Sequence, residues 1–169
     1  MSLIYEERES IIRENNTAQT VFSDIIKDLK SDVVELNINT HLDGDVDLSI
    51  CNFPKLRTVI FKEGKITNII NVPQHVTKLV CAGNILIELN DLPNSLLHLD
   101  CDRNYLTTID FKKIPNIQEL HCDDNKIEDF GVLPKSIVAL YCDNNRLKHI
   151  DLKDMKDLKT LHILSLIHI

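Results

Sequence analysis

Apolar and polar positions follow a pattern that recurs about every 20 residues through most of the chain. Four segments align without gaps, and each reads aliphatic-x-x-Leu-x-Cys-x-x-Asn-x-aliphatic-x-x-aliphatic, with Phe in the last position once. They begin at Val76, Leu96, Ile117 and Ile137. Because successive side chains of a strand point to opposite faces, the Leu and the Cys of each copy share one face. The pattern therefore predicts one short strand per copy, with this apolar face turned inward.

Weaker copies extend the pattern on both sides, beginning at Leu56, at Val33 in degenerate form and at Leu158 in truncated form. Every proline of the chain lies two or three residues before the first aliphatic residue of a copy: Pro54, Pro73, Pro93, Pro115 and Pro134. A single copy cannot bury its apolar face alone, so neighbouring copies must stack. The sequence predicts a solenoid of about six to seven coils over residues 31–163.

With these columns the sequence resembles the leucine-rich repeat family, whose signature is L-x-x-L-x-L-x-x-N/C-x-L. The short period and the prolines look most like the repeats of bacterial effectors and of some large-virus proteins. The resemblance implies an α/β right-handed solenoid. Each copy would add one strand to a concave parallel sheet, and short extended or 3-10 segments would return along the convex side.

Two further columns follow from the alignment. The resemblance implies a structural ladder in which an Asn of each copy satisfies backbone groups between coils: Asn84, Asn104, Asn125 and Asn145. A second column contains Cys81, Cys101, Cys122 and Cys142. Inward positions on adjacent strands are about 4.8 Å apart and form a line rather than a tetrahedron, and the chain has no C-x-x-C pair. We expect these cysteines to be small buried apolar residues rather than metal ligands.

Both ends depart from the repeat. Apolar side chains have helical spacing in residues 2–15 and 20–30, which predicts that residues 1–30 form a helical cap on the first coil. A helical docking or secretion segment is the alternative. Residues 164–169 read LSLIHI and lack a polar cap. They are expected to be a truncated or non-native tail, with the natural protein continuing beyond it.

Composition limits the classes of partner. The chain contains 19 Lys and Arg against 26 Asp and Glu, a net charge of −7, which argues against binding to nucleic acid or to an anionic membrane surface. No apolar stretch is long enough for a membrane span. Five cysteines cannot all pair within one chain, and reduced thiols favour a cytoplasmic location, or a host cytosol for an effector.

The outward positions of the predicted strands carry the candidate binding residues. They are mostly acidic or histidine: His98, Asp100, Asp102, Glu119, His121, Asp123, Tyr141 and Asp143. Asp102, Asp123 and Asp143 occupy one position of successive copies and form an Asp column. Three interpretations stay open: a solvated face, a docking surface for a basic protein anchored by Tyr141, and a divalent-cation site formed by the histidines and the Asp column. The first two interpretations need no metal and no cofactor. The sequence prediction therefore includes neither a metal nor a cofactor.

Catalysis has no support in the sequence. Residues 41–47 begin like a calcium loop, but Leu48 replaces the required Gly and Pro54 the required Glu. No Ser or Cys nucleophile lies beside a His in a strand-to-helix turn. The sequence therefore predicts a non-enzymatic module for protein–protein interaction. The alternative is the substrate-recognition part of a larger effector enzyme, such as a ubiquitin ligase. The oligomeric state is left open.

Overall fold

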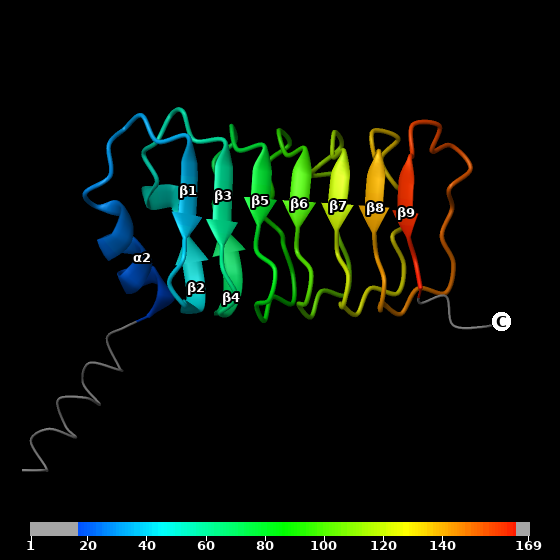
Figure 1. Ribbon diagram of the computed structural model, residues 1–169, viewed down its shortest axis with the longest axis horizontal. Coiled ribbons are helices and arrows are strands. Elements are labelled where there is room, and N and C mark those ends of the chain that lie inside the picture. The colour runs from blue at the N-terminus through cyan, green and yellow to red at the C-terminus, as the bar shows by residue number, and fades with distance from the viewer. Residues whose placement is uncertain (1–16, 165–169) are drawn as a thin grey trace, which may run out of the picture.

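The computed structural model describes residues 17–164 and shows a row of parallel strands with one helix at its first end (Figure 1). The helix α2 spans Ala18–Ile26. The main sheet contains β1 (Glu35–Ile38), β3 (Thr58–Phe61), β5 (Lys78–Val80), β6 (His98–Asp100), β7 (Glu119–His121), β8 (Ala139–Tyr141) and β9 (Thr160–His162). The helix expected over residues 2–15 and residues 165–169 of the expected tail lie outside the described residues.

Seven strands pair in the order β1-β3-β5-β6-β7-β8-β9, so each strand lies beside the strand of the next coil. All these pairs are parallel, and the register aligns one leucine column: Leu79, Leu99, Leu120, Leu140 and Leu161. The first four are fully buried, whereas Leu161 in β9 is 37% exposed. This arrangement confirms the parallel-strand solenoid that the repeat pattern predicted.

Each strand is short because the chain turns soon after it. Four residues at equivalent positions after β5, β6, β7 and β8 have left-handed backbone conformations, with φ of 68°, 53°, 54° and 54° at Gly83, Arg103, Asp124 and Asn144. The prolines occupy turns at the other end of each coil. For example, the amide of Leu96 donates to the carbonyl of Pro93 at 3.1 Å. Proline is tolerated there because the turn leaves it outside the strand ladder.

A second, two-stranded parallel sheet pairs β2 (Asp43–Asp47) with β4 (Lys65–Ile70), and the 3-10 helix η1 (Leu48–Ile50) follows β2. The strand β2 contains most of the segment that begins like a calcium loop, residues 41–47. Its carboxylates bind protein groups: the Asp45 side chain accepts from Thr67 and Asn68, and the Asp47 side chain accepts from Asn71.

The helix α2 covers the first coil. Its buried residues are Ala18, Phe22 and Ile26, and the ring of Phe22 lies 6.0 Å from that of Phe61 in β3. The Gln19 side chain forms two hydrogen bonds with the backbone of Asp47, at 2.6 and 3.2 Å. Apolar packing and these bonds thus fix the helix against β2 and β3.

Candidate functional site

The candidate site lies on the face of β5–β9 where the first and third side chains of each strand point outward; we call it the exposed face of the sheet. In β6 and β7, four such positions form a rectangle. The register places His98 across from Glu119 and Asp100 across from His121. Successive side chains of a strand point to opposite faces. The middle residue of each strand is buried in the leucine column, so the residues on either side of it point outward.

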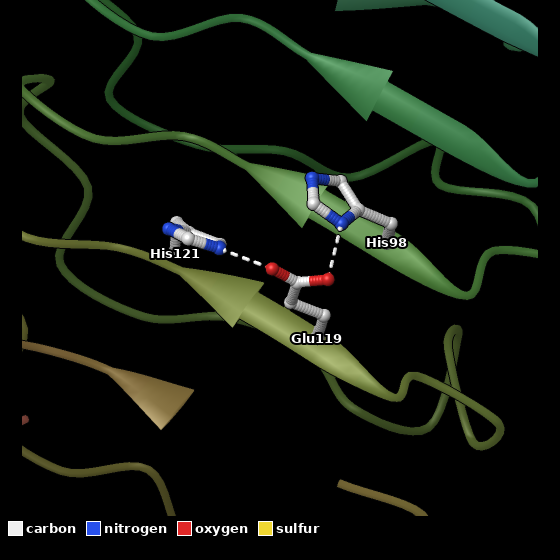
Figure 2. A group of neighbouring side chains, drawn as sticks. All are labelled: His98, Glu119 and His121. Carbon is white, nitrogen blue, oxygen red and sulfur yellow. Dashed lines mark hydrogen bonds and ion pairs between the residues drawn. The ribbon is translucent and has the colours of Figure 1, made fainter. Parts of the chain in front are cut away.

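Glu119 connects the two histidines of this rectangle (Figure 2). One carboxylate oxygen lies 3.0 Å from Nδ1 of His98, and the other lies 2.7 Å from Nε2 of His121. The hydrogen bond from His121 lowers the pKa of Glu119 most, and the bond and charge of His98 lower it further, against the opposing effect of burial. Glu119 is therefore an ionised acceptor, and both ring nitrogens donate to it.

A row of aromatic rings continues from this rectangle across β8 and β9. The ring of His121 stacks on Tyr141, with centroids 4.2 Å apart and planes 15° apart. Tyr141 in turn lies 4.7 Å from His162. The three residues share one strand position in the parallel register. His162 was not among the predicted binding residues, although the 20–21 residue period places it in the same column.

The three carboxylates of the Asp column join neighbouring coils. Oδ1 of Asp102 accepts the backbone amide of Asp123 at 2.7 Å, and Oδ1 of Asp123 accepts that of Asp143 at 2.6 Å. Oδ1 of Asp143 accepts the amide of Leu164, also at 2.6 Å. These side chains are only partly exposed. The column thus has a structural role that the sequence interpretation, which treated it as a charged surface, did not include.

Burial raises the pKa of two carboxylates in the Asp column. The pKa of Asp102 is raised to about 6, mainly by burial and further by the charge of neighbouring Asp100. The pKa of Asp123 is also raised, first by burial and then by the charge of Asp143. The hydrogen bond from the next coil opposes the shift in both residues.

The asparagines of the repeat lie between coils and are at most 8% exposed. Oδ1 of Asn125 accepts the amide of Leu106 at 2.9 Å. Its Nδ2 approaches the carbonyl of Cys101 in the preceding coil and those of Cys122 and Asp123 in its own coil. Asn104 and Asn145 repeat the same set of contacts. Asn84 likewise accepts the amide of Ile66, but its Nδ2 contacts the preceding coil at the carbonyl of Lys62, at 3.4 Å.

The cysteines of the repeat are all buried. The thiols of Cys101, Cys122 and Cys142 each donate to a carbonyl of the next coil at 3.3 Å. Burial raises the pKa of every cysteine in this column, to about 12 for Cys142. A thiol that stays protonated at neutral pH is a poor nucleophile and a poor metal ligand.

No helix within residues 17–164 is long and apolar enough to cross a membrane. No family model matches the chain, and no curated protein sequence matches it. The comparison with solved structures gives a match to YopM from Yersinia enterocolitica WA-314, with a TM-score of 0.53 and 21% sequence identity.

The match to YopM covers 80% of this chain and 38% of that chain, so this chain corresponds to less than half of the YopM length. At this level of identity the likeness concerns the fold. The repeat columns, the stacked parallel strands and the likeness to YopM together show that the chain has a leucine-rich-repeat-like solenoid fold.

Proposed function

We propose that the protein binds a protein partner through the exposed face of β5–β9 and that a basic segment of the partner contacts it. The observation that carries this proposal is the row of rings formed by His121, Tyr141 and His162, with the carboxylates of Asp100 and Glu119 beside it. A tyrosine held by stacking presents a large rigid surface and loses little conformational freedom on binding.

Charge supplies the preference for a basic partner. Asp100 and Glu119 lie on β6 and β7, next to the Asp column. A cluster of carboxylates raises the association rate of a cationic partner, and salt screens the attraction within about 8–10 Å. We therefore expect complex formation to weaken as the salt concentration rises.

Capture from lysate with matched baits tests the proposal. The wild-type chain, Tyr141→Ala and Tyr105→Ala are immobilised separately, and retained proteins are quantified by mass spectrometry. Tyr105 is exposed (46%), whereas Tyr141 is half-buried, and it lies outside the strands in the segment after β6. Its loss therefore controls for nonspecific contact with an aromatic ring. Proteins retained by the wild type and by Tyr105→Ala should fall at least about tenfold with Tyr141→Ala, since a central aromatic anchor contributes 2 kcal/mol or more.

A second variant, Asp100→Asn, tests the attraction between the carboxylates and a basic partner. Asp100→Asn keeps the side-chain oxygen that accepts the amide of Asp102 at 3.3 Å and removes one negative charge. Capture of the same proteins should fall and become less sensitive to salt. An unchanged set of retained proteins with both Tyr141→Ala and Asp100→Asn would show that another surface binds the partner.

The alternative, that the repeats recognise substrate for a catalytic domain of a longer effector, rests on the family resemblance. The natural gene distinguishes the two. Additional repeats and a polar cap beyond residue 163 would favour the binding module, whereas a helical domain with a lone Cys would favour the effector.

A further inference from the structure

We propose that His98, Glu119 and His121 form a binding site for a zinc ion on the exposed face of the sheet. One ligand atom from each of these residues can be chosen so that all three lie within 4.8 Å of one another, and no other such group occurs within residues 17–164. The proposal goes beyond partner binding, because it concerns an ion that the isolated chain would hold.

The ligand set suits zinc. Two imidazole nitrogens and one carboxylate are the protein ligands of many zinc sites that keep a fourth position open. In a tetrahedral site with bonds of about 2.0–2.1 Å, neighbouring ligand atoms are about 3.3 Å apart. The two nitrogens lie 2.7 and 3.0 Å from different oxygens of Glu119, and with a single ligand atom chosen per residue the three atoms lie within 4.8 Å of one another. Small side-chain rotations would therefore admit the ion between the three groups.

Zinc would take the place of the two hydrogen bonds between the histidines and Glu119. Without the ion, Nδ1 of His98 and Nε2 of His121 each donate a hydrogen bond to the Glu119 carboxylate. An ion bonded to both nitrogens requires the other tautomer of each ring, with the proton on Nε2 of His98 and on Nδ1 of His121. Each of these protons moves to the other nitrogen of its own ring by exchange with water, and the metal compensates the negative charge of Glu119.

The surroundings hold the ligands in place and leave them accessible. The stack with Tyr141 fixes the plane of the His121 ring, and the side chains of His98 and His121 remain 21% and 25% exposed. Asp100, across from His121, adds negative charge. Lys78, across from His98 on β5, adds positive charge. The charge of Lys78 opposes cation binding, so its removal should strengthen it.

Isothermal titration of the full chain with zinc chloride, in a non-coordinating buffer with a phosphine reductant, tests the site. We expect one zinc per chain. The dissociation constant should rise at least about tenfold in His98→Gln, in Glu119→Gln and in His121→Gln, since weaker perturbations of zinc sites already cost 10–100-fold. Lys78→Gln should lower it.

The matched control is His149→Gln, which removes an exposed histidine that lies 3.9 Å from Asp129. It should bind zinc as the wild type does. Circular dichroism checks that each variant is folded, and three independent ligand substitutions keep the test decisive if one variant unfolds. Equal affinity in the wild type and the ligand variants would overturn the proposal, as would the absence of saturable binding.

Cobalt identifies the ligands independently. Cobalt bound by nitrogen and oxygen should give visible d–d absorption that Glu119→Gln removes. A thiolate-to-cobalt charge-transfer band in the near ultraviolet would instead place the ion on cysteines and would also overturn the proposal. Neither measurement needs the protein partner, so this proposal and the proposed function fail separately.

Discussion

Asp102 combines a structural contact with an unfavourable charge. Its Oδ1 accepts the amide of Asp123 in the next coil, while burial and the charge of Asp100 raise its pKa to about 6. In the unfolded chain an aspartate titrates near 3.9. Between about pH 4 and pH 6 the folded state therefore holds more protons than the unfolded state, and the free energy of unfolding falls as pH rises through this window.

Asp102→Asn should stabilise the protein at neutral pH. Asparagine keeps the oxygen acceptor for the Asp123 amide and removes the charge, so the free energy of unfolding should rise by about 1 kcal/mol above pH 6, a gain limited by solvent screening. The gain should disappear toward pH 4, where Asp102 is protonated in the folded protein. Urea unfolding at several pH values measures it.

The exposed Asp91 provides the control. Asp91→Asn should change stability equally at all these pH values. A difference between Asp102→Asn and the wild type that stays constant from pH 4 to pH 7 would contradict the assigned role of Asp102.

Asn125→Ala should lower the free energy of unfolding by about 1–3 kcal/mol, because it leaves the buried Leu106 amide and several carbonyls without a partner. Asn116→Ala, at an exposed asparagine with one 3.5 Å hydrogen bond, should change it by less than about 0.5 kcal/mol. Thermal unfolding monitored by circular dichroism compares the two. Equal losses would mean that the ladder contributes nothing specific.

At the scale of elements, the helix α2 stabilises the first coil through Phe22. Phe22→Ala should lower the free energy of unfolding by about 3–5 kcal/mol, since the ring is fully buried against Phe61. Asp24→Ala on the exposed side removes only an exposed ion pair with Lys27 and should cost less than about 1 kcal/mol. Chemical denaturation of both variants gives the comparison, and a small loss for Phe22→Ala would show that the helix is dispensable.

The strands of the main sheet could be predicted because leucine and cysteine recur two residues apart in the four central copies, and other apolar residues take these positions in the weaker copies. The second sheet could not. In β4, the buried residues Ile66 and Ile69 are three apart, and the pairing with β2 shifts register between Gly44 and Val46. This irregularity removes the alternation by which a strand is identified in a sequence.

The candidate site also has features that the sequence predicts and features that it cannot predict. The repeat period alone predicts that His98, Glu119 and His121 lie on one face. It could not show that Asp102 turns an oxygen to the amide of Asp123, because this depends on how two coils 21 residues apart pack. It also could not show that the rings of His121 and Tyr141 stack, since side-chain rotations decide this.

For the whole molecule, stability should depend on position along the row of strands, since each coil contacts only its neighbours. Leu120→Ala, between two coils and fully buried, should cost about 2–5 kcal/mol. Leu161→Ala, where the residue is 37% exposed, should cost about half as much or less. Urea unfolding measures both, and equal losses would contradict a stack of nearest-neighbour contacts.

The contacts between coils have a direction. Asn104 binds the coil before it, through the amide of Leu86 and the carbonyl of Cys81, whereas Asp102 binds the amide of the coil after it. The coils that begin at Leu96, Ile117 and Ile137 therefore form both kinds of contact, whereas Ala82 replaces the Asp in the coil that begins at Val76. An in-frame duplication of one of these three copies, or a deletion of the copy that begins at Ile117, would bring matching contacts together again. Such a gene could change in length by whole coils during evolution while its product keeps the same local structure.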